Sequence, residues 1–235
     1  MNENFFEDLK RVFFENGGLT LMLKGVGNTV IIALSAVVIG VVLGSLCAIV
    51  KVSDGKGVLL KIAKAIVGVY ITVIRGTPLM VQLLFTYFGV FATAMRGNPH
   101  KAILIAVLVF GVNSGAYVAE IIRSGIQAVD VGQMEAGRSL GLSHSTTMLR
   151  IVLPQAVKNI IPALGNEFIM LIKDSSVASA ITVVEMTKRA QGLVSKFYVA
   201  LPIYAVLALL YLALTSLAAE GMKLIEKRMR RSDRR

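Results

Sequence analysis

The sequence contains one cysteine, little charge and none of the common catalytic motifs. Cys47 lies inside an apolar run, so one chain can build neither a disulfide framework nor a cysteine-based metal site, and we interpret this side chain as a small buried hydrophobe. No G-x-x-x-x-G-K-S/T phosphate loop, G-x-S-x-G or H-E-x-x-H motif occurs. The chain is therefore expected neither to bind ATP by itself nor to catalyse a hydrolysis.

Charged residues make up 17% of the 235 residues and hydrophobic residues 55%, which is too apolar for an ordinary soluble domain. The formal net charge of +11 does not indicate a nucleic-acid partner, because the basic residues sit between apolar runs and no recognition motif accompanies them. Residues 1–19 carry acidic side chains and lack the basic-then-apolar order of a cleaved signal peptide. The composition predicts a membrane protein whose first apolar run serves as its own insertion signal.

Five apolar runs have roughly the 20-residue length that crosses a bilayer. They cover residues 26–50, 66–90, 102–122, 160–184 and 201–219. In the first run, Gly40 and Gly44 form a small-xxx-small pair suited to close helix packing. In the second, Pro78 should remove a backbone hydrogen bond and bend the helix. We predict an all-α polytopic membrane protein with five transmembrane helices in a single domain, residues 1–235.

The basic residues predict the orientation of these helices. Segments 51–64 and 123–158 and the tail after Ala219 hold fifteen Lys or Arg residues, Lys56 among them, whereas the segments on the other side hold eight. Lys and Arg accumulate on the cytoplasmic side of membrane proteins. The N-terminus is therefore expected outside and the C-terminus in the cytoplasm. His100 and His144 then lie in loops on opposite sides and cannot share a metal ion, so we expect no metal site.

Segment 123–158 becomes a cytoplasmic loop long enough to suggest a function. It reads Glu135-Ala136-Gly137, three residues, Gly141-Leu142, eight residues, Ile151, one residue, Leu153-Pro154. Residues Met134 to Leu140 can form a short helix stopped by Gly141, and Ser143 is a candidate N-cap for a second helix that runs to the region of Pro154. A simpler interpretation makes Glu135 a solvated helix residue and Gly141 a C-cap.

This pattern resembles the EAA loop of binding-protein-dependent ABC permeases, E-A-A-x3-G-x9-I-x-L-P, with Gly137 in place of the second alanine. In that family the loop docks into a groove on the ATPase subunit. The resemblance implies an ATPase-coupling role for Glu135, Ala136, Gly137, Gly141 and Leu142. A glycine in place of alanine loosens the helix by about 1 kcal/mol.

The resemblance extends over most of the chain from Gly25 onward. Segments Arg75–Gln82, Ala116–Arg123 and Gly165–Phe168, with Lys173–Ser176, look like the polar amino-acid branch of the same family. This implies the permease subunit of an ATP-driven importer in a prokaryotic inner membrane, with three partners: a cytoplasmic ABC ATPase dimer that binds the ATP, a second permease chain and an extracytoplasmic amino-acid-binding protein. The resemblance leaves three points open. The substrate can be glutamine, a basic amino acid or cystine, and the second permease can be a copy of this chain or a related one. The receptor can be free, lipid-anchored or fused to another subunit.

Polar side chains inside the predicted spans need a partner or a wet cavity. An amino-acid zwitterion requires a cation for its carboxylate and a carboxylate for its ammonium, which Arg75 and Asp174 supply. The substrate-pathway hypothesis comprises Arg75, Tyr87, Asn113, Glu167 and Asp174. The alternative is a structural ion pair between Asp174 and Arg75 or Lys173.

Glu120 and Arg123, three residues apart, are expected to form a structural pair.

Three other function classes are weaker. A secondary transporter or channel would use the intramembrane charges as an ion relay, but it leaves segment 123–158 unexplained. A membrane-embedded enzyme could pair Glu167 with Asp174, but no nucleophile or metal set accompanies them. A purely structural scaffold has no need of charge inside three spans.

Overall fold

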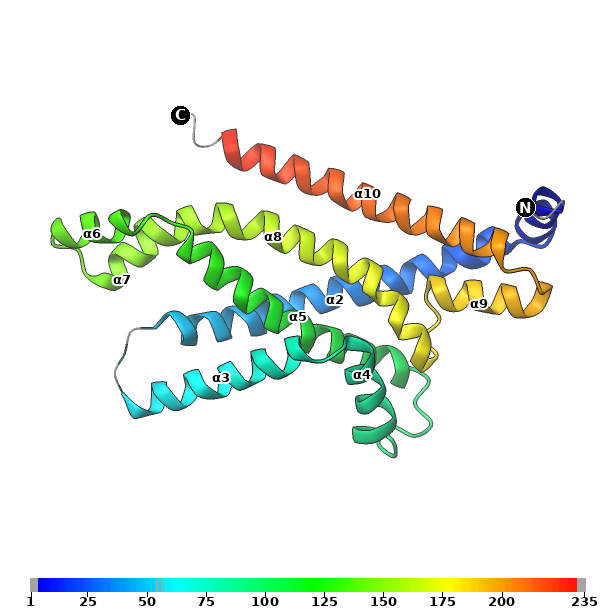
Figure 1. The fold of residues 1–235 in the computed structure, drawn as a ribbon, viewed down its shortest axis with the longest axis horizontal. Helices are drawn as coiled ribbons and strands as arrows, with labels where there is room; N and C mark the ends of the chain where they lie inside the picture. Colours follow the sequence, from blue (N-terminus) through cyan, green and yellow to red (C-terminus); the bar gives the residue numbers. More distant parts are fainter. Residues whose placement is uncertain (1–3, 54, 56, 232–235) are drawn as a thin grey trace. The chain divides into compact units, whose positions relative to one another are not determined.

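The computed structural model describes residues 4–53, 55 and 57–231, and every regular element in this part of the chain is a helix (Figure 1). Lys56 and the end of the basic C-terminal tail lie outside the described residues. The all-α prediction is confirmed. In chain order the elements are α1 (Phe5–Leu9), η1 (Lys10–Glu15), α2 (Gly18–Val52), α3 (Val58–Gly76), α4 (Leu79–Leu84), η2 (Phe85–Val90), α5 (Lys101–Gln127), α6 (Val131–Ser139), α7 (His144–Thr147), η3 (Met148–Val152), α8 (Leu153–Asp174), η4 (Ser175–Ile181), α9 (Met186–Phe197) and α10 (Leu201–Arg231).

These helices form two compact units, described separately below. Unit 1 comprises the chain up to Ala36, Thr77–Gly111 and Ile169–Ala218; unit 2 comprises Val37–Gly76, Val112–Phe168 and the chain from Ala219. The expectation of a single transmembrane domain stays a prediction.

Within residues 4–53, 55 and 57–231, three helices are long and apolar enough to cross a membrane: Gly18–Val52, Lys101–Gln127 and Leu201–Met229. They contain the first, third and fifth predicted runs. Each extends beyond the apolar run, because a helix continues for as long as its backbone hydrogen bonds are uninterrupted, whatever the polarity of its side chains. The described residues thus support three spans, and the count of five stays a prediction.

The second run is broken rather than bent. α3 ends at Gly76, Pro78 is extended with φ −64° and ψ 134°, and α4 begins at Leu79. Proline lacks the donor that would continue the helix, and its ring disfavours the helical conformation of Thr77 before it. Residues 66–90 are therefore not one helix, and the break separates the Arg75 end of α3 from the short helix α4.

The fourth run also changes conformation. α8 begins at Leu153 and ends at Asp174, after which Ser175–Ile181 form the tighter turns of η4. The Ser175 hydroxyl donates to the Ile172 carbonyl at 2.7 Å, a side-chain bond that competes with the helix ladder. Thr182 ends the segment in the left-handed region with φ +67°. The polar sequence around Asp174 therefore marks a helix end and not the centre of a helix.

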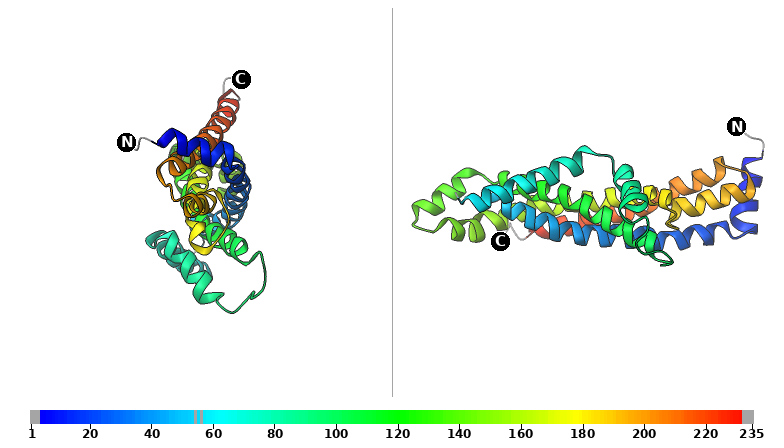
Figure 2. Two further views of the ribbon diagram at one scale, coloured as in Figure 1. Left: turned by 90° about the vertical axis from the view of Figure 1, so that its right-hand side faces the viewer. Right: turned by 90° about the horizontal axis from the view of Figure 1, so that it is seen from below.

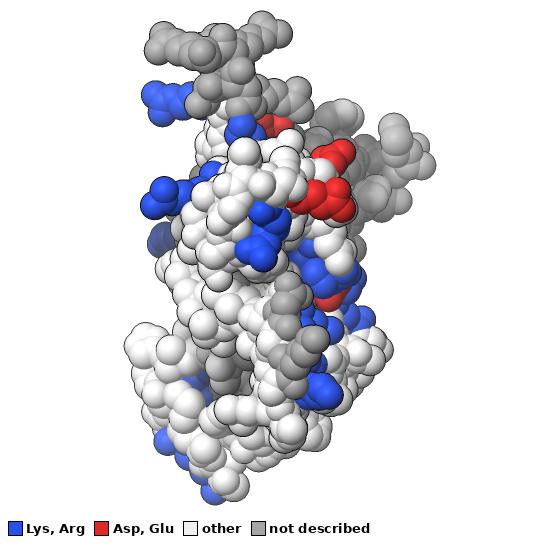
Figure 3. All heavy atoms as spheres, turned by 90° about the vertical axis from the view of Figure 1, so that its left-hand side faces the viewer, with Lys and Arg blue, Asp and Glu red and all other residues white. Residues whose placement is uncertain are grey.

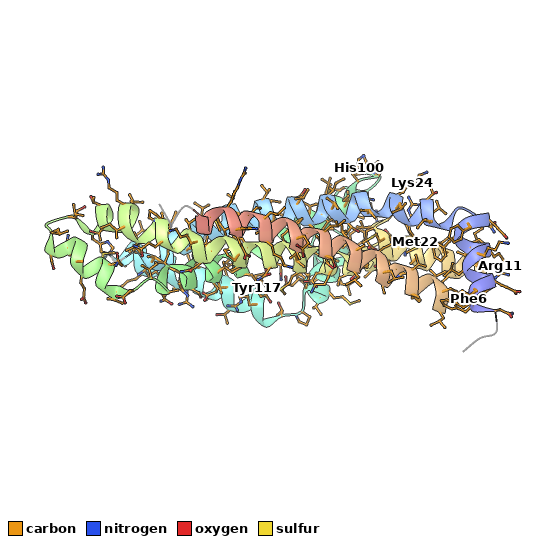
Figure 4. All side chains as sticks on the ribbon, turned by 90° about the horizontal axis from the view of Figure 1, so that it is seen from above. Phe6, Arg11, Met22, Lys24, His100 and Tyr117 are labelled. Carbon is orange, nitrogen blue, oxygen red and sulfur yellow. The ribbon has the colours of Figure 1, made fainter. Side chains whose placement is uncertain are left out.

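In unit 1, residues 186–197 form helix α9, where a connection between spans was expected. Its apolar face is buried with η1 and the first turns of α2 and α10, which lie side by side in Figures 1 and 2. The fully buried members include Val12, Met22 (labelled in Figure 4) and Met186. Burying each such side chain contributes about 1.5–3 kcal/mol. The apolar spacing of residues 186–194 is the signal that was available.

Glu185 caps α9 from a fully buried position. Its carboxylate accepts hydrogen bonds from the backbone N–H groups of Thr187 and Lys188, both at 2.7 Å, and from the Tyr211 hydroxyl at 3.0 Å. Burial raises the pKa of the Glu185 carboxyl, and these hydrogen bonds oppose the rise. The network fixes the start of α9 to α10.

In unit 2, α2 and α5 approach closely at the two predicted glycines. A Cβ atom on Gly40 would lie 2.5 Å from Oγ of Ser114, and one on Gly44 would lie 2.6 Å from Cβ of Val118. Only a residue without a side chain fits at these distances. The small-xxx-small prediction is confirmed for this helix pair.

Candidate functional site

The segment around the EAA-like motif folds in unit 2 as α6, α7 and η3. Asp130 caps α6 by accepting from the Gly132 N–H at 2.7 Å, and Ser143 caps α7 by accepting from the Thr146 N–H at 3.1 Å. Gly141 turns the chain between the two helices with φ +81°, a conformation that favours glycine. Both predicted short helices and the Ser143 cap are confirmed, although α6 begins at Val131.

Gly137 allows α6 to pack closely against Thr147 of α7. It is buried, and a Cβ atom on it would lie 2.4 Å from Cγ2 and 2.9 Å from Oγ1 of Thr147. Thr147 is fully buried, and its hydroxyl donates to the Ser143 carbonyl at 3.0 Å. The glycine that replaces the family alanine is thus matched to a larger residue on the facing helix, so α6 and α7 pack tightly together.

Glu135 lies in the middle of α6 with its side chain exposed, and Ala136 beside it is exposed as well. Gly141 and Leu142 follow at the turn, with Leu142 half-buried and its carbonyl accepting from Nη1 of Arg138 at 2.8 Å. The chain then stays helical through η3 into α8, past Pro154. Segment 123–158 is therefore a folded helical element with an exposed carboxylate, not an extended loop.

Two of the predicted pathway residues lie buried in unit 2. Glu167 on α8 is 6% exposed and accepts from the Ser114 hydroxyl at 2.9 Å; Asn113 on α5 is 8% exposed. Ser114 also contacts the Gly40 position of α2. A carboxylate held by a hydroxyl between helices can provide a polar lining where those helices separate. Ser114 was not predicted as a pathway residue, although its position beside Asn113 in a span could have suggested it.

Arg75, the third pathway residue in unit 2, is the penultimate residue of α3 and faces α5. Its Nη1 lies 4.0 Å from Oε2 of Glu120, and its guanidinium carbon lies 5.1 Å from the ring centre of Tyr117, which is labelled in Figure 4. Arg123 donates to the same Oε2, through Nε at 3.0 Å. The predicted Glu120–Arg123 pair is confirmed. Tyr117, Glu120 and Arg123 recur every three residues on α5, a spacing that marks one helix face.

These side chains line a cleft of about 660 Å³ in unit 2. Its other walls come from the last turns of α5 and the facing part of α8, including Asn159. The volume falls in the range of small-molecule sites. Two guanidinium groups and one carboxylate in one cleft give it a net positive charge.

The remaining pathway residues, Tyr87 and Asp174, lie in unit 1. Nζ of Lys101 stands 4.9 Å from the ring centre of half-buried Tyr87, a cation–π contact. Asp174 is half-buried at the last position of α8. The five pathway residues are thus divided between the units, and their common role stays a prediction. Within residues 4–53, 55 and 57–231, no three His, Cys, Asp or Glu side chains are grouped as metal ligands.

Comparison with known proteins defines the class. Residues 40–231 match the model of the family described as "Binding-protein-dependent transport system inner membrane component". The chain belongs to this family of ABC permeases: it is a transport subunit, and the ATPase is a separate chain.

Individual relatives are amino-acid permeases. The chain is 34% identical over 219 residues to the arginine transport system permease protein ArgU of Corynebacterium glutamicum, covering 88% of this chain and 68% of that protein. It is 34% identical over 214 residues to the glutamine transport system permease protein GlnP of Escherichia coli K12, covering 90% and 94%. A crystal structure of an amino acid ABC transporter with histidines superposes with a TM-score of 0.84 at 39% identity, covering 97% of this chain and all (100%) of that one. The type I ABC permease fold is therefore established.

Proposed function

We propose that this chain is the permease subunit of a polar amino-acid importer in a prokaryotic inner membrane, driven by a separate ATPase dimer that binds the ATP. The observation that carries the proposal is the α6–α7 element: two capped helices packed through Gly137 and Thr147, with Glu135 exposed. A rigid element with an exposed acidic side chain can transmit a push from a docked subunit, whereas an unpacked loop would absorb it.

We assign five spans to α2, to the segment from α3 into η2 that is broken at Pro78, and to α5, α8 and α10. α8 has 22 residues, so at 1.5 Å per residue it reaches roughly 33 Å, close to the thickness of a bilayer core. Lys61 and Lys64 in the first turns of α3 reduce its mean hydropathy, and Lys side chains can reach the interface from a helix end. The N-terminus then lies outside and the C-terminus inside.

The charge distribution supports that orientation. On the face drawn in Figure 3, which looks at the end that bears α6 and α7 in Figure 1, Lys and Arg are more frequent than Asp and Glu. Such a face fits the cytoplasmic side of a membrane protein. The opposite side is assigned to docking of the extracytoplasmic amino-acid-binding protein.

A second permease chain, identical or related, completes the path. The described helices contain no second copy of the pocket-forming α3–α5–α8 arrangement, and symmetric pairing is the usual way in which a small bundle closes a site. Two relatives are named for the transport of arginine and glutamine, and one solved amino acid ABC transporter was crystallised with histidines. Buried Glu167, together with Asn113 in the same unit, is the pair from which selectivity among these substrates is expected to arise.

The experiment that tests the proposal is receptor-stimulated ATP hydrolysis. The chain is co-purified with its ATPase in lipid nanodiscs, and hydrolysis is measured with and without a loaded amino-acid receptor for wild type, Glu135→Arg and the matched control Glu220→Arg. Glu220 is also exposed, on α10. Stimulation lost in Glu135→Arg and retained in the control is the expected result. An ATPase that neither co-purifies nor responds to the receptor would instead favour ion-driven uptake.

A further inference from the structure

The cleft in unit 2 that Arg75, Tyr117, Glu120 and Arg123 line has no role in the coupling element or at buried Glu167. It lies against the end of α5, where Ser124 and Ala128 form its wall, and Ala128 precedes the Asp130 cap of α6 by two residues. Under the proposed orientation this is the cytoplasmic end of the permease. A ligand in the cleft would therefore sit directly beside the element that is proposed to contact the ATPase.

Arg75 is the first polar group of the cleft that remains able to donate hydrogen bonds to a ligand. Nη1 of Arg75 is 4.0 Å from Oε2 of Glu120, too far for a hydrogen bond, and among the described residues this guanidinium donates no hydrogen bond. Tyr117 holds it in place through the face of its ring at 5.1 Å. A guanidinium has five N–H donors in a fork that matches a carboxylate. Arg75 is thus held in position with its fork available.

Glu120 provides the opposite charge. The two hydrogen bonds from Arg123 both end on Oε2, so within the described part of the chain Oε1 is not engaged by Arg123. The carboxylate is 20% exposed at the cleft. An ammonium group can share this oxygen without displacing Arg123. The Arg75 guanidinium can therefore bind a carboxylate and Oε1 of Glu120 an ammonium group, and both side chains line the same cleft.

We infer that this cleft is an exit-side binding site for the transported amino acid, with Arg75 binding the α-carboxylate and Oε1 of Glu120 the α-ammonium. Asn159 on α8 is exposed at the cleft and provides a further neutral hydrogen-bonding group. The site recognises the backbone of the amino acid and not its side chain. The inference rests on the proposed function, because it takes the ligand to be the importer's own substrate.

Cysteine labelling tests the site without receptor or ATP. Cys47 is replaced by alanine, and Ser124, exposed on the cleft wall, by cysteine. The rate of maleimide labelling of the permease–ATPase complex in nanodiscs is measured with L-glutamine or L-arginine, with N-acetyl-L-glutamine, and with inorganic phosphate. Ser53→Cys, in a separate apolar groove of unit 2, is the matched control.

At least one of the two amino acids should slow labelling at residue 124 and leave the rate at residue 53 unchanged. Arg75→Gln should raise the half-protecting concentration roughly tenfold or more, because it removes charge-assisted hydrogen bonds, and Arg75→Lys should restore part of the protection because it keeps the charge but not the fork. Glu120→Gln should remove the difference between glutamine and its N-acetyl derivative.

Three outcomes would overturn the inference. These are no protection by any of the amino acids, protection that survives Arg75→Gln, and equal protection by phosphate, which would make the cleft a general anion site. Receptor-stimulated hydrolysis by the same preparation reports separately on the proposed function. If that stimulation is present while protection is absent, the exit site alone is rejected.

Discussion

The packing of Gly137 against Thr147 predicts that one substitution has opposite effects in two backgrounds. In a helix, Gly→Ala contributes about 1 kcal/mol of stability. At Gly137 the new Cβ would lie 2.4 Å from Cγ2 of a fully buried threonine, and such overpacking costs about 1–3 kcal/mol. The steric term is the larger, so Gly137→Ala should destabilise the α6–α7 element by up to about 2 kcal/mol.

Truncating the Thr147 side chain should make Gly137→Ala stabilising instead of destabilising. Thr147→Ala deletes both Cγ2 and Oγ1, and by itself should cost about 1–2 kcal/mol through the lost methyl group and the lost hydrogen bond to Ser143. In that background the nearest remaining side-chain atom would be Cβ of residue 147, at 3.2 Å. Gly137→Ala then retains most of its helix-forming gain, so the double variant should be more stable than Thr147→Ala alone.

Hydrogen exchange of the α6 amides, followed by mass spectrometry on the permease–ATPase complex, measures this local stability directly. Each 1.4 kcal/mol corresponds to roughly a tenfold change in exchange rate. The four proteins form a double-mutant cycle whose interaction energy should be about 1–3 kcal/mol. Additive effects of the two substitutions would refute the steric reasoning. The same cycle measured by receptor-stimulated hydrolysis shows whether tight packing of the element is needed for coupling.

Three further predictions follow from other sites. Gly44→Ala should destabilise the permease by about 1–3 kcal/mol in thermal melting, because the new Cβ would lie 2.6 Å from Cβ of Val118. The control Gly27→Ala, whose Cβ would have nothing within 4 Å, should be neutral or stabilising. Equal melting temperatures of the two variants would contradict the close approach of α2 and α5. Burial raises the pKa of the Glu185 carboxyl in the folded protein. Between the pKa of the unfolded chain and that of the folded protein, the folded state therefore binds more protons than the unfolded state. The free energy of unfolding is then greatest below the unfolded-state pKa and falls as the pH rises through the folded-state pKa. Glu185→Gln should flatten that dependence in melting curves between pH 4 and 8, and an unchanged slope would exclude Glu185 as its source. Glu167→Gln keeps the contact with Ser114 but removes the charge, so arginine uptake should fall more than glutamine uptake in vesicles; equal losses would argue against an electrostatic role in selectivity.

Several features of the fold follow from local sequence alone. Pro78 must interrupt a helix because it lacks a donor, Ser143 caps α7 because its hydroxyl reaches the Thr146 N–H, and Gly141 takes a positive φ. These are interactions over a few residues, so the sequence pattern contains all the information they need.

Other features depend on residues far apart in the chain. Helix α9 is polar along much of its length, and its folding depends on η1, α2 and α10, which bury its apolar face. The end of α8 at Asp174 likewise was not predicted, because apolar residues resume after the polar segment Lys173–Ser176 and continue to residue 184. Hydropathy measures the average environment of a segment, and it cannot show where a helix ends inside that environment.

The sequence by itself determined that this protein is an all-helical membrane permease with a segment that resembles the EAA loop, because hydropathy, charge placement and motif spacing are properties of the linear chain. Only the tertiary structure decided what the individual polar residues contact. Arg75 meets Glu120 and Tyr117, Glu167 meets Ser114, and Gly137 meets Thr147. These pairs are separated by ten to more than fifty residues along the chain, so the packing of the helices, which no local pattern encodes, brings them together.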